Sequence, residues 1–521
     1  MAERLIGIET EYAITGNLKD ESNPGNECLI NDLLRLARQR LDYLPDHGEG
    51  LFLGNGSRFY VDYGMHPELA TPECTTPSEV VRYVLAGERI LVKLVRELEA
   101  RSYPPDSVSL WKCNVDYSGT WATWGCHESY LHRMNPGELS AQIIPHLVSR
   151  LIYTGAGGFD SDSQGSKFTL SPRVPHITNV TSPHSTSDRG IFHTKDETLA
   201  SEGFHRLHLI CGESLCSETS MWLKVATTAL VVAMAEAGLC LSNAVQLIDP
   251  LIAMRSFASD PECKATAETA NRKRMTAIEI QRHYLGRAEA HLHDSFMPAW
   301  AGEVCRKWRE ILVRLERGPA AVNKTLDWAI KLALYEDFAR RQDVPWEMLS
   351  HWTHVREGTR REVAGANRYG QDLESVFEDR QRTLRGTGRL LQPLMKEKKL
   401  NQSDFGTFLR LRKQLFEIDM RFGQLGDKGI FAELDHKGIL DHKITDIGDI
   451  ERATIHPPEG TRARLRGDFI RRANGPRERY YCDWQSIWDD TERRSLDLND
   501  PFATEEQWSE CVQANPSSDW Q

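Results

Sequence analysis

Residues 5–14 read LIGIETEYAI, a stretch in which apolar and polar side chains alternate. On a β-strand, residues two positions apart point to the same face, so Glu9 and Glu11 project together. Two neighbouring carboxylates repel each other unless a cation or a basic group lies between them. Hard divalent ions such as Mg²⁺ are bound by oxygen ligands of this kind. The pattern predicts either a strand that binds a metal ion or an ordinary strand with a solvated face.

Residues 55–73, NGSRFYVDYGMHPELATPE, contain a second candidate strand. Arg58, Tyr60 and Asp62 share one face of this strand, and the apolar residues between them take the other. Apolar side chains toward a core and polar ones toward a cavity are typical of a binding site. The alternatives are a structural ion pair between Arg58 and Asp62 and a simple turn at residues 66–67.

Two further segments place histidines beside charged residues. In residues 206–213, RLHLICGE, Arg206 and His208 share a strand face, and His127 lies between Cys126 and a glutamate. A histidine in such a strand is either a ligand or a hydrogen-bonded structural residue. Cys126 is not expected to be a nucleophile, because the sequence offers no separate base for it.

The composition is that of a folded, acidic protein. Acidic residues outnumber basic ones, 75 against 64, and the net charge of −11 argues against nucleic acid as a partner. The longest apolar run, residues 225–241, is too short and too polar to span a membrane. The N-terminus carries no signal-peptide pattern. The eleven cysteines form no CxxC pair, which predicts free thiols and a cytoplasmic location.

The order of the predicted elements indicates an α+β fold. Short strands dominate the first third of the chain, together with helices expected over residues 31–44 and 77–101. Residues 261–422 have an almost wholly helical pattern. The tail carries a basic run over residues 461–472 and an aromatic stretch over residues 480–488, which predicts a small appended domain.

Several motifs in a fixed order resemble the Pup ligase and depupylase family of glutamine-synthetase-like carboxylate-amine ligases. They are Gly7–Tyr12, Asn55–Glu73, Arg206–Glu218, TRARLRGDF over Thr461–Phe469, Asp483-Trp484 and Asn499–Ala503. The resemblance implies a glutamine-synthetase-like antiparallel sheet cradle packed with helices, over residues 1–435. It also implies a small C-terminal domain, residues 436–521, that completes the nucleotide site.

The resemblance assigns roles to residues at matching positions. It implies that Asp62 is the catalytic residue. The metal contacts that it implies are Glu9, Tyr60 and Glu68, and Glu11, His127 and His208 lie in matching motifs and are expected at the same metal site. The nucleotide contacts that it implies are Arg58, Thr71 and Trp484, with Arg206 expected beside them. Trp484 could instead belong to the core of the small domain.

The family chemistry uses ATP and two or more Mg²⁺ ions. The terminal glutamate of Pup, or of a Pup-like small disordered modifier, attacks the γ-phosphate of ATP and gives an acyl phosphate. A lysine of a target protein then attacks this intermediate and forms an isopeptide bond. Because free lysine is mostly cationic near neutral pH, Asp62 is expected to remove its proton.

The direction of the reaction depends on finer features. The opening Gly-Ile-Glu-Thr-Glu resembles ligases, and residues 16–53 leave no room for the long loop that depupylases insert there. Residues 72–77 and 86–89 look more like the depupylase branch. A ligase is predicted, and the alternatives are a depupylase or deamidase, a small-molecule γ-glutamyl ligase and a non-catalytic scaffold. Departures from the usual family residues, at Ala13, Met65 and Ser129, leave the identity of the modifier open.

Overall fold

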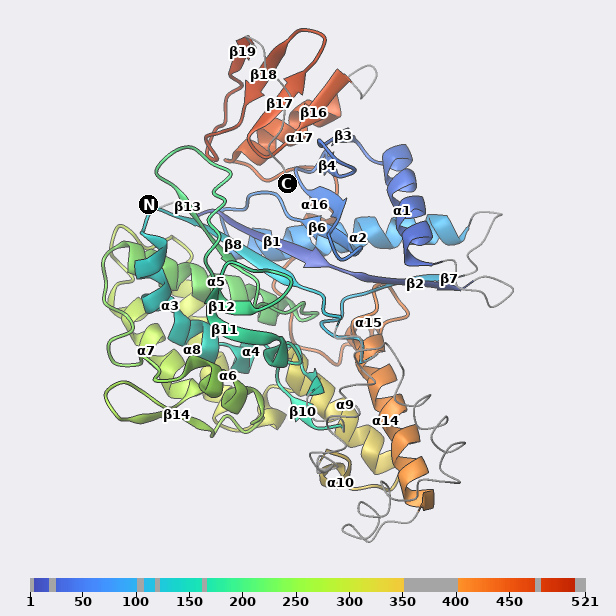
Figure 1. The fold of residues 1–521 in the computed structure, drawn as a ribbon, viewed down its shortest axis with the longest axis vertical. Helices are drawn as coiled ribbons and strands as arrows, with labels where there is room; N and C mark the ends of the chain where they lie inside the picture. The colour runs from blue at the N-terminus through green and yellow to red at the C-terminus, as the bar shows by residue number, and fades with distance from the viewer. Residues whose placement is uncertain are drawn as a thin grey trace.

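The computed structural model describes residues 4–17, 25–100, 107–117, 122–161, 166–350, 402–473 and 479–510. At its centre is a seven-stranded antiparallel sheet in the order β13-β8-β1-β6-β5-β4-β3 (Figure 1). The strands are β1 Ile6–Glu11, β3 Tyr43–Pro45, β4 Leu51–Leu53, β5 Arg58–Val61, β6 Pro67–Ala70, β8 Cys126–His132 and β13 His205–Leu209.

One face of this sheet is apolar and packs on two long helices, α2 (Pro77–Glu99) and α5 (Glu218–Glu236). Ile6 and Ile8 of β1 are buried in the core on that side. The helix α2 lies close to β6 at Gly87, where an added Cβ would meet the Leu69 side chain at 2.6 Å. Because side chains alternate along β1, Glu9 and Glu11 point to the opposite face of the sheet.

A capping box fixes the start of α2. The side-chain oxygen of Thr76 accepts a hydrogen bond from the backbone N–H of Glu79, and the Glu79 carboxylate accepts one from the N–H of Thr76. Two of the N–H groups that a helix start leaves unpaired are satisfied in this way. The helix predicted over residues 77–101 is confirmed, and it ends at Glu99.

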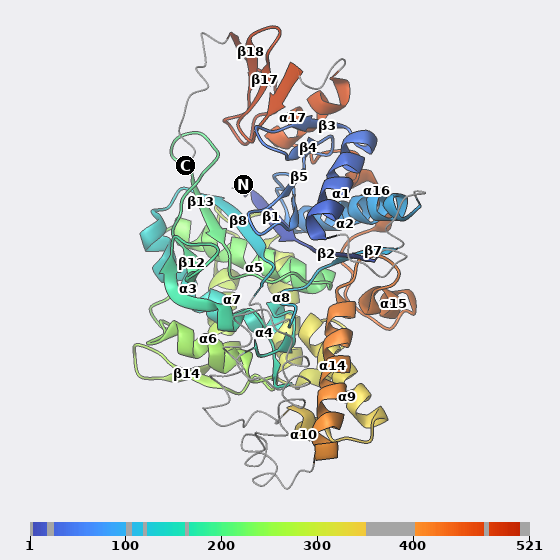
Figure 2. The same ribbon diagram turned by 45° about the vertical axis from the view of Figure 1, so that its right-hand side comes forward.

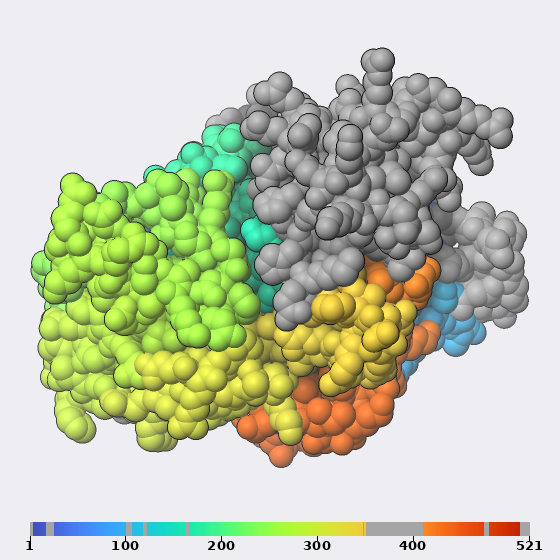
Figure 3. All heavy atoms as spheres, turned by 90° about the horizontal axis from the view of Figure 1, so that it is seen from below, coloured from blue at the N-terminus to red at the C-terminus, as the bar shows by residue number. Residues whose placement is uncertain are grey.

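Most of the other helices lie in the lower half of Figure 1, away from the segment coloured red, and Figure 3 shows this end of the molecule from below. They are α3 Pro136–Ser149, α4 Leu151–Thr154, α6 Pro250–Ala258, α7 Ala277–Ala290, α8 Ala301–Leu315, α9 Asp327–Arg341, α10 Trp346–Ser350, α14 Gln402–Phe422 and α15 Ile430–His436. A hairpin, β14 Thr266–Glu268 with β15 Arg274–Thr276, interrupts the stretch that was expected to be almost wholly helical. Residues 351–401 of that prediction lie outside the described residues.

Shorter elements complete the N-terminal half. The helix α1 spans Asn26–Arg40, and not residues 31–44. It ends earlier than predicted because Tyr43–Pro45 pairs with β4 as an edge strand. The other strands are β2 Ala13–Asn17 paired with β7 Ser107–Trp111, β9 Gly158–Phe159 with β10 Phe168–Thr169, and β11 Ile177–Ser182 with β12 Arg189–His193. Two short 3₁₀ turns lie at Val174–His176 and Pro319–Ala321.

The C-terminal part of the chain forms a small sheet that sits on β3, the edge strand of the large sheet, and on β4 beside it (Figure 2). The small sheet consists of β16 Tyr480–Cys482, β17 Ser486–Asp489, β18 Arg494–Asp497 and β19 Trp508–Glu510, and the helix α17 Arg462–Arg472 packs with it. The helix α16, Ile447–Ala453, packs on α2. The core of the small sheet includes Leu44 and Phe52 from β3 and β4, so the two parts share apolar packing. The α+β architecture is confirmed, and the division at residue 436 stays a prediction.

Within the described ranges, no helix has the length and apolar character needed to cross a bilayer.

Candidate active site

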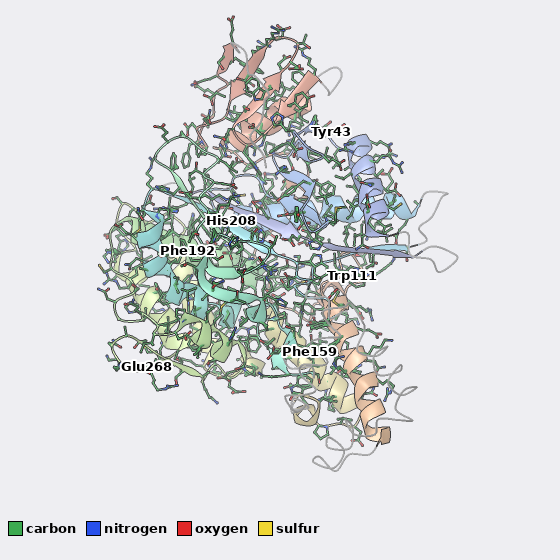
Figure 4. The ribbon with its side chains drawn as sticks, viewed as in Figure 1. Tyr43, Trp111, Phe159, Phe192, His208 and Glu268 are labelled. Atoms are coloured by element: carbon green, nitrogen blue, oxygen red, sulfur yellow. The ribbon has the colours of Figure 1, made fainter. Side chains whose placement is uncertain are left out.

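The polar face of the large sheet collects charged side chains from five neighbouring strands. Glu9 lies opposite His127 of β8 and Ala70 of β6, and Glu11 lies opposite Glu68. His208 of β13 lies at the far side of β8, where Figure 4 labels it near the middle of the molecule. The strand register therefore brings the sequence-predicted acids and histidines onto one surface.

Glu9 is surrounded by three basic side chains. Its Oε1 accepts a hydrogen bond from Nη2 of Arg206 at 2.8 Å, and its Oε2 lies 3.5 Å from Nδ1 of His127 and 3.6 Å from Nε2 of His208. Burial alone would raise the pKa of Glu9, but Arg206 and the two histidines hold it well below its usual value. Glu9 is therefore ionised at neutral pH.

His208 is available as a neutral ligand. Burial and the adjacent charge of Arg206 lower the pKa of His208 to about 4. A neutral imidazole keeps a lone pair that can bind a metal ion. Ligand atoms of Glu9, His127 and His208 lie within 4.8 Å of one another, close enough to share one cation.

A second group forms around His66, which sequence reasoning had treated as part of a turn. Its Nδ1 lies 3.1 Å from Oε2 of Glu11 and 3.2 Å from Oδ2 of Asp62, and its backbone N–H donates to Oδ1 of Asp62 at 2.6 Å. Burial opposes the charged form of His66, but Asp62 and Glu11 raise its pKa to about 9. Although burial would raise the pKa of Glu11, the hydrogen bond with His66 and the charge of His127 lower it to about 2. His66 thus fixes the orientation of the Asp62 carboxylate.

The surroundings of Glu68 oppose ionisation of its carboxyl group. Burial, together with the negative charges of Glu9 and Glu11, raises the pKa of Glu68 well above its usual value. Tyr60 lies opposite Glu68 across β5 and β6 and is hydrogen-bonded to it. A divalent cation at this position would favour the ionised carboxylate of Glu68. Carboxylate oxygens with flanking imidazoles suit Mg²⁺ or Mn²⁺. The donor set therefore fits the metal that the sequence predicts.

Two cavities border these groups, and Trp484 lines both. The inner cavity lies between the sheet, the loop 198–200 and the C-terminal residues, and Thr71 and Arg206 line it. The outer cavity, of about 500 Å³, is lined by Arg58, Tyr60 and Asp62. The residues predicted to contact nucleotide thus lie around the boundary between the two cavities.

Arg58 does not pair with Asp62, which corrects one alternative drawn from the sequence. Its Nε donates to Oδ2 of Asp46 at 3.1 Å, and its guanidinium carbon lies 4.2 Å from the centre of the Tyr60 ring. Asp62 lies just past the end of β5, where His66 holds it. The Asp62 carboxylate is therefore not neutralised by the arginine on its own strand.

Sequence reasoning also missed a buried ion-pair cluster between the sheet and α17. Glu73 contacts Arg462 and Arg466 of the TRARLRGDF motif, 389 and 393 residues away. The sequence contained both motifs but no signal that they touch. Cys126 is buried, with its Sγ 3.1 Å from Nζ of Lys224 on the core side, and the expectation that it is not a nucleophile stays a prediction.

The comparisons agree over nearly the whole chain. A family model described as "Pup-ligase protein" matches residues 4–354 and 367–488. A relative from Acidimicrobium ferrooxidans, described as a Pup--protein ligase, is 33% identical and covers 97% of each chain. Another from Xylanimonas cellulosilytica, with the same description, is 30% identical over 96% of this chain and 97% of its own.

Two solved structures share the fold. The complex between prokaryotic ubiquitin-like protein Pup and its ligase PafA matches with a TM-score of 0.72 and 24% identity, over 96% of this chain and 90% of that one. The Pup ligase PafA in complex with ADP matches with a TM-score of 0.67 and 24% identity, over 90% of each chain.

Proposed function

The chain belongs to the Pup-ligase protein family, and from this premise we propose that it joins the C-terminal glutamate of Pup, or of a Pup-like modifier, to lysines of target proteins with the use of ATP. The observation that supports this most strongly is the acidic sheet face, which carries Glu9, Asp62 and Glu68 within the region that the family model matches. A non-catalytic scaffold would have no need of these mutually repelling acids, of which Glu68 is buried.

We propose that ATP lies at the boundary of the two cavities. Thr71 and Arg206 contact it from the inner side, Arg58 contacts it from the outer side, and Trp484 lies between them. The small domain, residues 436–521, supplies Trp484 and completes the nucleotide site of the catalytic domain, residues 1–435.

Glu9, Tyr60 and Glu68 are the proposed metal contacts, with Glu11, His127 and His208 beside them. A bound divalent cation would neutralise phosphate charge during transfer. The carboxylate of the modifier's glutamate attacks the γ-phosphate of ATP, which forms an acyl phosphate and releases ADP. The guanidinium group of Arg206, beside Glu9, lies where it can bind phosphate oxygens.

Asp62 is the proposed base. The attacking lysine must lose a proton, and a carboxylate removes it only when it is held beside the ammonium group. His66 holds one Asp62 oxygen through its backbone N–H and contacts the other through its ring. Asp62 also lines the outer cavity, through which a lysine side chain could approach.

The direct test mixes the purified protein with ATP, Mg²⁺, a modifier that ends in glutamate and a lysine-bearing target. We expect a conjugate whose mass equals target plus modifier minus water, and none with a target whose lysines are methylated to quaternary ammonium. A second mixture starts from preformed conjugate. Cleavage there, without ligation in the first mixture, would mean that the chain is a depupylase.

We also propose a cytoplasmic location, because the ten cysteines within the described residues are all free.

A further inference from the structure

A buried guanidinium group lies against Trp484, the tryptophan that lines both cavities. The Cζ atom of Arg466 lies 4.8 Å from the centre of the Trp484 ring and 5.4 Å from that of Phe52. The Arg466 side chain has no exposed surface. The face of an aromatic ring attracts a cation that lies over it, and the attraction is stronger where water is excluded.

Arg466 is itself held from the sheet side. Its Nη2 donates to Oε2 of Glu73 at 2.5 Å and to the carbonyl oxygen of Gly56 at 3.1 Å. The other oxygen of Glu73 accepts from Nε of Arg462 at 2.6 Å. Although burial alone would raise the pKa of Glu73, Arg466 and Arg462 lower it to about 2, so the pair stays ionised at neutral pH.

The helix that carries Arg466 is pressed onto the turn between β4 and β5. At Gly467 an added Cβ would lie 2.6 Å from the carbonyl oxygen of Gly54, so no larger residue fits there. Gly56, whose carbonyl Arg466 binds, has a φ of +84°. The two glycines allow an approach close enough for the guanidinium to reach Glu73.

The indole of Trp484 is partly buried and packs against the core that the small sheet shares with β3 and β4. It lies in the turn between β16 and β17, where the Asp483 carboxylate accepts hydrogen bonds from the N–H groups of Gln485 and Ser486. These bonds fix the backbone of the turn, and the orientation of the indole depends on the side chains that contact it. Phe52 meets the indole edge-on with ring centres 5.1 Å apart, and Arg466 contacts it as a cation.

We propose that Arg466, anchored by Glu73, is a positioning residue that holds the Trp484 indole in the orientation that binds the nucleotide. The inference rests on the proposed nucleotide contact of Trp484. Glu73 follows Thr71 by two residues, and both line the inner cavity. One chain of contacts thus links the strand that carries Glu68 to the indole of the small domain.

The test is a double-mutant cycle between the two residues. The dissociation constant of ADP in the presence of Mg²⁺ is measured by calorimetry for the wild type, Arg466→Met, Trp484→Ala and the double variant. We expect Arg466→Met to weaken binding at least about fivefold in the wild-type background and less than about twofold in the Trp484→Ala background. In ligation assays it should raise the KM for ATP and leave kcat at saturating ATP within about twofold.

Matched variants separate positioning from general damage to the fold. Arg472→Gln, on the exposed side of the same helix where Arg472 pairs with Glu506, should leave ADP affinity unchanged. Arg466→Lys keeps the charge and loses the planar fork, so it should fall between the wild type and Arg466→Met. If Arg466→Met fails to fold, Arg466→Lys takes its place in the double-mutant cycle.

The outcomes distinguish this inference from the function on which it rests. If Trp484→Ala leaves ADP affinity unchanged, the nucleotide role of Trp484 and the positioning role of Arg466 both fail. If Trp484→Ala weakens binding but the Arg466 variants weaken it equally in both backgrounds, Arg466 acts only on the fold and the positioning role alone is overturned. A loss of kcat without a change in KM would overturn it as well.

Discussion

Glu73 gives the most quantitative test of how the C-terminal residues are joined to the sheet. Its side chain is 12% exposed and pairs with Arg462 and Arg466. Burial alone would raise its pKa, but the two guanidinium groups lower it from 4.5 to about 2. A lowered pKa means that the ion pairs stabilise the fold above pH 4.5, and that this contribution is lost as the pH falls towards 2. The full contribution is about 3 kcal/mol.

The pH dependence can be followed well before the carboxylate itself is protonated in the folded state. At about pH 3.5 the carboxyl group is already protonated in most unfolded chains, and about 1.4 kcal/mol of the contribution has gone. Glu73→Gln removes the titrating group. The gap in unfolding free energy between the wild type and Glu73→Gln should therefore shrink by about 1.4 kcal/mol between pH 7 and about pH 3.5.

Urea unfolding followed by tryptophan fluorescence measures this gap. Glu459→Gln is the matched control, because Glu459 also pairs with an arginine of α17, Arg464, but is 85% exposed. Exposed ion pairs contribute little, so its gap should stay constant across the pH range. A gap for Glu73→Gln that also stays constant would refute the buried pairing and the lowered pKa.

Three further predictions concern the reaction. Chelation by EDTA should abolish ligation and excess Mg²⁺ should restore it, and Glu9→Gln should lose activity with an unchanged circular dichroism spectrum; full ATP-dependent activity in EDTA would contradict the metal site. Asp62→Asn should slow ligation by at least about 100-fold without changing ADP affinity, and a normal rate for this variant would exclude Asp62 as the base. Trp484→Ala should weaken ADP binding by about 1–3 kcal/mol, whereas Trp508→Ala, in the same small sheet but away from both cavities, should not. Unchanged ADP affinity with a large loss of stability would assign Trp484 to the core.

Local pattern was enough to predict the strands β1, β5 and β13, the helix α2 and the α+β class. Alternation placed Glu9 and Glu11 on one face, and the helix pattern located α2 within two residues of its observed end. The end of α1 was misplaced because Tyr43–Pro45 pairs with β4 as a strand, and its start at Asn26 was also missed. The β14–β15 hairpin was missed for another reason, since strands of three residues each leave almost no periodic signal.

Contacts between distant parts of the chain could not be read from the sequence. The pairing of Arg58 with Asp46 depends on the turn between β3 and β4, and that of Asp62 with His66 on the turn between β5 and β6. Spacing along one strand had left a pair between Arg58 and Asp62 open as one alternative. Which partner an ion selects is decided by the turns that bring other segments close, and a single-strand pattern carries no information about those turns.

The fold and the candidate site depend on the same alternation in β1. Ile6 and Ile8 fix the register of this strand because they must be buried beneath the helices. A shift of one residue would bury Glu9 and Glu11 in that core and expose the isoleucines. The cost of burying unpaired carboxylates is large, so the apolar residues that stabilise the sheet also direct the acids to the open face. The repulsion among those acids is then left for basic side chains and a bound cation to balance.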